Sequence, residues 1–166
     1  MADLFMMCGV PGSGKSTWAK NHLRTFDRYI SRDDIRFSMV KENEEYFSKE
    51  NEVFREFCYQ INKNLEDGYD TFADATHISK NSRAKLINNV RGYENIYIIV
   101  IEKPLMTIFE QNEKRAGTRS YVPKSVIRRM KNQFEFPTYE EGFKTIFRVV
   151  SDEEPIQIIK SYEEDK

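Results

Sequence analysis

The chain has 166 residues, of which 39% are hydrophobic and 32% are charged, a composition typical of a folded globular protein rather than a disordered or fibrous one. We expect a single domain over residues 1–166, since this length suits one sizeable core. The longest apolar run, residues 96–101, is far below the roughly 18 residues of a membrane span. The N-terminus lacks the features of a secretory signal, so we expect no membrane contact and a cytoplasmic location.

The net charge is −1, but basic residues are concentrated in one segment. Residues 114–131 hold seven basic and no acidic residues. Two interpretations stay open, because such a segment either contacts phosphate groups or forms a solvated helix face. The two cysteines, Cys8 and Cys58, show no metal-ligand spacing. We expect both to be buried, reduced thiols.

Short apolar runs alternate with longer amphipathic segments, a pattern typical of βα units around a mainly parallel sheet. The first run is fully apolar, as a central parallel strand should be. Five strands with helices between them predict an α/β protein with a three-layer α/β/α architecture. The expected strands are residues 4–8, 29–31, 71–73 (ending on Asp74), 96–101 and 146–150.

The longest helix is expected within residues 42–66, where apolar side chains recur at three- and four-residue spacing before Gly68. Prolines and potential caps delimit the others. Residues 115–122 are polar and contain a glycine between two of these helices, so we expect an irregular segment that can move. The other expected helices are residues 81–91 with Ser79 as the cap, residues 105–114, and a helix that starts at Pro123 and stops before Pro137.

A phosphate-binding loop follows the first expected strand. Residues 9–16 read GVPGSGKS and match G-x-x-x-x-G-K-[ST] at every fixed position. Glycines let backbone N–H groups approach an anion, and the following helix adds its positive dipole end. Lys15 should reach the β- and γ-phosphates, and the Ser16 hydroxyl should bind Mg²⁺. The expected cofactors are ATP, or another NTP, and Mg²⁺; the expected nucleotide-binding residues are Gly9, Pro11, Gly12, Ser13, Gly14, Lys15, Ser16 and Thr17.

Residues 31–36, SRDDIR, follow the second expected strand, at the sheet edge where doubly wound folds bind ligands. A carboxylate here can align an acceptor hydroxyl, and an arginine one turn later can bind an anionic part of the acceptor. The same residues also fit an ordinary helix start, because Asp is favoured at N-caps. Both interpretations stay open on the residues alone.

These motifs, in this order, resemble those of the polynucleotide 5′-hydroxyl kinase family. Residues 9–18 (GVPGSGKSTW), 31–36 (SRDDIR) and 112–118 (NEKRAGT) resemble the 5′-kinase domain of phage polynucleotide kinase. Residues 134–143 (FEFPTYEEGF) are similar to the segment that closes the kinase domain of eukaryotic polynucleotide kinase/phosphatase. The resemblance covers nearly the whole chain and implies a P-loop kinase fold with a helical lid at residues 115–122.

The resemblance also implies roles for four side chains around the acceptor and the lid. Asp33 aligns with the general base that activates the 5′-hydroxyl, and Arg36 aligns with the ligand of the acceptor phosphate. Arg115 aligns with the lid arginine that bridges the donor phosphates. Arg119 lies on the same segment and is a second candidate for that role.

Residues 74–77, DATH, resemble the Asp-x-Thr-Asn motif of these kinases. In that motif the carboxylate holds Mg²⁺ or orients the acceptor-binding residues, so Asp74 is a candidate metal and substrate ligand. His77 stands where Asn is usual. We expect it to be a surface histidine, which seldom has a special role.

Together, these features predict a kinase that transfers the γ-phosphate of ATP to a hydroxyl, with the 5′-OH end of a polynucleotide as the leading acceptor. The first alternative is a small-molecule acceptor such as a nucleoside, metabolite or antibiotic, which the near-neutral charge favours. The second is a nucleotide-dependent switch or binding protein. Asp33 and Arg115 argue against a switch, since a switch needs neither an acceptor base nor a lid arginine.

Overall fold

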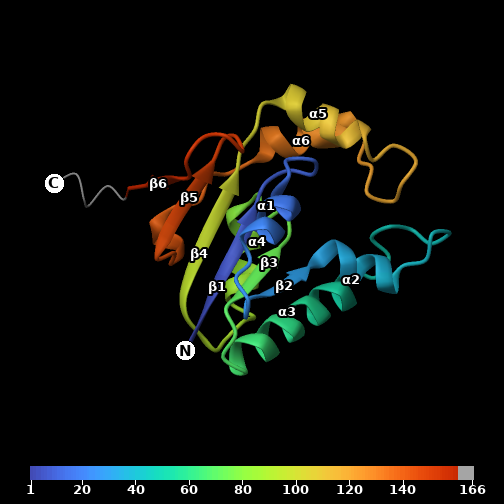
Figure 1. Cartoon of the computed structure of the whole chain (residues 1–166). Helices are drawn as coiled ribbons and strands as arrows, with labels where there is room; N and C mark the ends of the chain where they lie inside the picture. Colours follow the sequence, from blue (N-terminus) through green and yellow to red (C-terminus); the bar gives the residue numbers. More distant parts are fainter. Residues whose placement is uncertain (161–166) are drawn as a thin grey trace.

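The computed structural model describes residues 1–160 and confirms the α/β prediction (Figure 1). Its sheet has six strands in the order β2-β3-β1-β4-β5-β6. Neighbouring strands are parallel except for β5 and β6, which are antiparallel. The strands are β1 (Ala2–Cys8), β2 (Arg28–Ser31), β3 (Thr71–Asp74), β4 (Tyr93–Ile101), β5 (Thr145–Val149) and β6 (Gln157–Ile159).

The sixth strand corrects the prediction of five. β6 has three residues, mostly exposed, at the edge of the sheet, so no run of alternating apolar and polar residues indicates it. It pairs with β5, and the Tyr139 hydroxyl donates a hydrogen bond to the Ile159 carbonyl. Tertiary contacts rather than a local pattern therefore define this strand.

β1 occupies the centre of the sheet between β3 and β4. It is apolar because both of its faces are covered: Leu4, Met6 and Met7 are fully buried. On the other side of β3, Ser31 at the end of β2 is the register partner of Asp74. Since the three strands are parallel, the residues that follow β1, β2 and β3 gather at one edge of the sheet.

Helices connect the strands on both faces of the sheet. α4 ends earlier than the expected helix over residues 81–91, because Asn88 is its C-cap. Gly92, at a φ of 84°, then redirects the chain into β4. The expected cap of this helix is present, since Ser79 and Ser82 form a capping box. The helices are α1 (Lys15–His22), α2 (Arg32–Met39), α3 (Glu50–Glu66), α4 (Lys80–Ile87), α5 (Leu105–Glu113) and α6 (Lys124–Gln133), with a 3-10 turn at Tyr139–Glu141.

The core divides by sheet face, as a three-layer architecture requires. α1 contributes Ala19 to a cluster with Met7 and Phe72 on one face. α2, α3 and α4 pack on the other face, in the cluster that contains Phe57 and Leu86. A third cluster joins α5 and α6 to the phosphate-binding loop beyond the strand ends. Figure 1 shows α5 and α6 beyond the tips of the central strands, with α2 and α3 to the side.

A buried ion pair joins α4 to the 3-10 turn. Arg83 is fully buried, and its Nε lies 2.7 Å from Glu141 Oε1. Arg83 Nη1 also donates to the carbonyl of His77 at 2.9 Å. The ion pair therefore fixes the segment that begins directly after Asp74, at the end of β3.

Both cysteines are buried and free, as expected. Cys8 Sγ donates to the His77 carbonyl at 3.2 Å, and burial raises the pKa of this thiol to about 12. It therefore stays protonated. Within residues 1–160, no helix combines the length and the apolar character needed to span a membrane.

Candidate active site

The phosphate-binding loop turns directly from β1 into α1. Gly12 and Gly14 have φ angles of 83° and 89°, in the left-handed region that glycine adopts without a steric penalty. Gly9 N donates to the Thr76 carbonyl at 2.9 Å, which joins the loop to the segment after β3. A Cβ at Gly9 would lie 2.8 Å from Ser13 Oγ, so this position has no room for a side chain.

The loop borders a cavity of about 550 Å³. Lys15 and Ser16 begin α1 and contribute to its wall, although most of the Lys15 side chain is buried. Ser13 is fully buried, and Thr17 is exposed outside the cavity. Of the predicted nucleotide-binding residues in the loop, Pro11, Gly12, Gly14, Lys15 and Ser16 line the cavity, whereas Gly9, Ser13 and Thr17 do not.

Asp74 contacts Ser16 directly in the wall of the same cavity. Ser16 Oγ donates to Asp74 Oδ2 at 2.5 Å, and the Tyr29 hydroxyl donates to the same oxygen. Burial, followed by the negative charge of Asp74, raises the pKa of the Tyr29 phenol, so Tyr29 stays a donor. Tyr29 was not predicted from the sequence.

These oxygens fit a Mg²⁺ ion. Asp74 Oδ1 is buried and has no hydrogen-bond partner among the described residues, which leaves a carboxylate oxygen available beside the Ser16 hydroxyl. Residues 1–160 contain no group of three His, Cys, Asp or Glu side chains that could hold a metal ion. A site with one carboxylate and one hydroxyl suits Mg²⁺, which usually keeps several waters and binds substrate phosphates.

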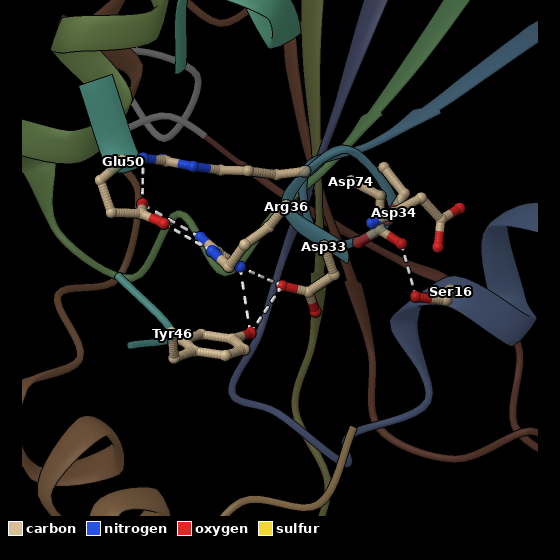
Figure 2. Close-up of polar contacts among 9 residues, drawn as sticks. Ser16, Asp33, Asp34, Arg36, Tyr46, Glu50 and Asp74 are labelled. Atoms are coloured by element: carbon tan, nitrogen blue, oxygen red, sulfur yellow. Dashed lines mark hydrogen bonds and ion pairs between the residues drawn. The ribbon is translucent and has the colours of Figure 1, made fainter. Parts of the chain in front are cut away.

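Asp33 and Arg36 form the opposite side of the cavity (Figure 2). Arg36 Nη1 lies 2.5 Å from Asp33 Oδ1, and the Tyr46 hydroxyl lies 3.2 Å from the same oxygen. The Asp33 side chain is 58% exposed, whereas that of Arg36 is 7% exposed. The carboxylate is therefore accessible to a substrate while the guanidinium beneath it is fixed.

Glu50 holds the other side of the Arg36 guanidinium. Arg36 Nε and Nη2 donate to its two carboxylate oxygens at 2.5 and 3.1 Å. Burial lowers the pKa of Arg36, but the hydrogen bonds to Glu50 and the electrostatic attraction to Tyr46, Glu50 and Asp33 together raise it overall. Burial likewise opposes ionisation of Glu50, but Arg36 lowers its pKa overall. Glu50 was not predicted as a site residue, because it lies in an acid-rich segment without a motif.

Residues 31–36 form a capped helix start, as one of the two interpretations expected, and the acceptor role of Asp33 stays a prediction. Ser31 is the N-cap of α2, and its Oγ accepts a hydrogen bond from Asp34 N at 3.2 Å. Asp33 is thus not the cap, and its carboxylate is free to contact Arg36. Because Ser31 pairs with Asp74 across β2 and β3, Asp33 and Asp74 lie at the same end of adjacent strands.

Arg115 and Arg119 lie on the turns between α5 and α6 and line the cavity. Figure 1 shows this loop facing the one between α2 and α3. Arg119 joins the α5–α6 loop to the end of α2, because its Nη1 donates to Phe37 O at 3.2 Å and its Nη2 donates to Val40 O. These carbonyls lie at the C-terminal end of α2, where a cation is favoured. Arg119 therefore connects the predicted lid to α2.

The ends of the predicted lid meet on one side chain. Asn112 is fully buried, its Nδ2 donates to Val122 O at 2.6 Å, and its Oδ1 accepts from Val122 N at 3.0 Å. The segment between these residues is a series of turns rather than a helix. The sequence did not indicate that Asn112 closes this loop.

The basic segment of residues 114–131 divides into two parts. Arg115 and Arg119 face the cavity, whereas Lys124 and Arg128 lie over the ring of Phe109, at 5.6 and 5.3 Å from its centroid. Lys124 and Arg128 are exposed on α6, as the interpretation as a solvated helix face expects, whereas phosphate contact stays a prediction for Arg115 and Arg119.

His77 is buried, and the expectation of a surface histidine was wrong. Its Nδ1 donates to the Met7 carbonyl at 2.7 Å, and its φ of 46° lies in the left-handed region. Burial lowers the pKa of His77 to about 4, so the ring is neutral near pH 7. Asn adopts this φ more readily than most residues do, which matches its usual presence at this position of the motif.

The parallel sheet, the phosphate-binding loop at the end of β1 and the facing carboxylates define a P-loop NTP-dependent phosphotransferase. The chain belongs to the AAA domain family, which matches residues 4–137.

Known proteins resemble this chain over different shares of their length. A protein described as transcription factor bHLH140 from Arabidopsis thaliana is 24% identical over 95% of this chain and 17% of its own length. A chain in a structure of the Pnkp1/Rnl/Hen1 RNA repair complex is 27% identical, with a TM-score of 0.69, over 80% of this chain and 43% of that one. A sugar kinase from Janibacter sp. HTCC2649 shares the fold at 17% identity and a TM-score of 0.64, over 89% and 85%. This chain spans less than half the length of the first two.

Proposed function

We propose that the protein transfers the γ-phosphate of ATP to the 5′-hydroxyl end of a polynucleotide. The observation that carries this proposal is that Asp33, paired with Arg36, lines the same cavity as Lys15 of the phosphate-binding loop. An acceptor base and a donor site that share one cavity can bring a hydroxyl in line with a bound γ-phosphate.

Asp33 accepts the proton of the acceptor hydroxyl as its oxygen attacks the γ-phosphorus. Both hydrogen bonds that the described residues make to this carboxylate use Oδ1, so Oδ2 is available to the hydroxyl. Arg36 and Tyr46 hold the carboxylate in one orientation, which limits the entropy lost when the acceptor aligns. The proton stays on the Asp33 carboxyl group, the bond between the γ-phosphorus and the β,γ-bridging oxygen breaks, and ADP is released as the γ-phosphoryl group passes to the acceptor oxygen.

The donor side stabilises the charge that spreads over the transferred group. Lys15 and the backbone N–H groups of the loop bind the phosphates, and Arg115 approaches them from the turns between α5 and α6. Mg²⁺ held at Ser16 and Asp74 would supply further charge neutralisation. Tyr29 keeps the Asp74 carboxylate directed at Ser16 through the oxygen that both hydroxyls share.

A nucleic-acid acceptor is supported by two observations. The cavity has several arginines on the acceptor side, Arg32, Arg36 and Arg119, which suit a substrate that carries phosphates beyond its reacting hydroxyl. The chain is also 27% identical to part of a protein found in an RNA repair complex. A small-molecule acceptor is the second candidate, favoured by the net charge of −1 and by a fold shared with a sugar kinase.

An acceptor panel tests the proposal. Labelled ATP is offered with DNA and RNA oligonucleotides that end in a 5′-OH, and separately with nucleosides and with sugars. The proposal predicts label on the oligonucleotides, and Lys15→Ala should abolish transfer to every acceptor. Label confined to nucleosides or sugars would establish the second candidate instead, and nucleotide binding without transfer would support a switch.

A further inference from the structure

Phe47 exposes a large apolar ring at the edge of the active-site cavity. Its exposed fraction is 59%, and it lines the same cavity as Asp33 and Lys15. Contact with an apolar group would remove the Phe47 ring from water, which is favourable in proportion to the apolar area buried. The ring also has no polar atom with which to bind a phosphate or a hydroxyl. Its position at the acceptor side therefore suggests contact with an apolar part of the substrate.

The ring is held in place by the residues that orient the acceptor carboxylate. Tyr46 meets Phe47 edge to face, with ring centroids 4.6 Å apart and an angle of 89° between the rings. The Tyr46 hydroxyl lies 3.2 Å from Asp33 Oδ1 and 3.1 Å from Arg36 Nη1. The Arg36 guanidinium lies 5.5 Å from the Phe47 centroid. Phe47 thus has a fixed relation to the carboxylate that would receive the hydroxyl proton.

The cavity also has an apolar wall on the side of the lid. Val122 and Pro123 end the turns after Arg115, and Val126 and Met130 lie on α6. A planar, largely apolar group with a polar edge suits such a cavity, because one face can stack on an aromatic ring while the edge stays hydrated. A nucleobase has these properties, whereas a sugar has no planar π-face and carries a hydroxyl on most of its carbons.

We propose that Phe47 stacks on the nucleobase of the acceptor's 5′-terminal nucleotide and so contributes to selection of a nucleic-acid end over a sugar. This inference rests on the proposed function. With the base on Phe47, the ribose or deoxyribose lies toward Asp33 with its 5′-hydroxyl. Stacking is tolerant of sequence because every base has a π-face, so Phe47 favours the presence of a terminal base without favouring one base over another.

The test compares two oligonucleotides that both end in a 5′-OH, one with a normal terminal base and one with an abasic terminal nucleotide. The wild-type KM should be about 5- to 150-fold lower for the normal end, the range given by one stacked base. Phe47→Leu, which keeps an apolar side chain without a π-face, should remove most of this difference by raising KM for the normal end alone. Phe47→Trp should restore it, and the KM for ATP should stay constant in all variants.

Phe26→Leu is the matched control, because Phe26 is 74% exposed and is not among the residues that line the cavity. It should leave both KM values unchanged. Equal KM values of the wild-type protein for the two ends would overturn the stacking inference while leaving the proposed function intact. An equal loss with both ends in Phe47→Leu would also overturn it, since it would indicate a structural role. Transfer to neither oligonucleotide would overturn the proposed function, and the inference with it.

Discussion

Glu50 and Arg36 form a two-point ion pair beneath the acceptor side of the cavity, with hydrogen bonds of 2.5 and 3.1 Å between guanidinium and carboxylate (Figure 2). The pair connects the first turn of α3 to α2. Arg36 also contacts Asp33. The position of the Asp33 carboxylate therefore depends on Glu50, which is distant from it in the sequence. Glu50 is therefore a positioning residue for the proposed reaction.

Glu50→Gln should lower kcat/KM for the acceptor by about 10- to 100-fold, as loss of an orienting partner commonly does. The mostly buried Arg36 would lose its charged partner, and its contact with Asp33 would no longer be fixed. The KM for ATP should change little. Glu52→Gln is the matched control, because Glu52 is an exposed acid in the same turn of α3. Acceptor kinetics unchanged from the wild type would contradict the positioning role.

Tyr29→Phe should weaken the binding of Mg²⁺, raising the Mg²⁺ concentration for half-maximal rate by about 10-fold or more. The variant removes the hydroxyl that holds the Asp74 carboxylate and keeps the ring in its half-buried place. The Mg²⁺ titration at saturating ATP measures this effect. Tyr59→Phe, on an exposed tyrosine of α3, controls for loss of a hydroxyl elsewhere. Identical titrations of the wild type and Tyr29→Phe would exclude a role of Tyr29 at the metal site.

Glu141→Ala should destabilise the fold by about 3–5 kcal/mol, because it leaves the fully buried Arg83 cation without its partner. The free energy of unfolding in urea measures this loss. Glu140→Ala is the matched control at the adjacent, exposed position, and it should cost under about 0.5 kcal/mol. If the two variants lose similar amounts, the ion pair makes no special contribution to stability.

His77 should make stability depend on pH below neutrality. Its folded-state pKa is about 4, whereas an unfolded histidine titrates near 6.5. Between these values the unfolded chain binds the extra proton, so stability falls as pH decreases from about 6.5 to about 4, by about 3 kcal/mol from this group. Above pH 7 both states are neutral, and the contribution is constant.

The comparison of unfolding free energies at pH 7 and pH 4.5 for the wild type and His77→Asn isolates this term. Asn does not titrate and tolerates the left-handed φ of 46°. The loss between the two pH values should be smaller in His77→Asn than in the wild type. Parallel losses would show that His77 does not titrate differently on folding.

The sequence predicted those features that depend on local patterns. The phosphate-binding loop could be predicted from its fixed spacing, because Gly12 and Gly14 adopt left-handed φ angles and Lys15 begins the helix that follows directly. β1, β3 and the second half of β4 are largely apolar because the sheet buries them. Asp33 and Asp74 were predictable at one edge of the sheet, because Asp33 follows β2, Asp74 ends β3, and the carboxyl ends of parallel strands share one edge.

The features that the sequence did not predict depend on contacts between distant segments. Glu50 lies 14 residues from Arg36. The turns between them have no periodic pattern from which their conformation could be predicted. Asn112 closes the lid through two hydrogen bonds between its side chain and the backbone of Val122, although in the sequence it looks like an ordinary helical residue. His77 was misjudged because histidine is common at surfaces, and only the packing of β1 and α4 around it makes it a core residue.

The central claim is that Asp33 activates a 5′-hydroxyl for attack on the γ-phosphate of ATP. The most direct measurement is single-turnover transfer of labelled γ-phosphate to an oligonucleotide that ends in a 5′-OH, by the wild type and by Asp33→Asn, with ATP affinity measured in parallel. A 5′-phosphorylated copy of the oligonucleotide is the blocked control. We predict labelling of the 5′-OH end alone, a rate about 10²- to 10⁴-fold lower in Asp33→Asn, and unchanged ATP affinity. Near-normal transfer by Asp33→Asn, or no transfer to the 5′-OH end by the wild type, would contradict the claim.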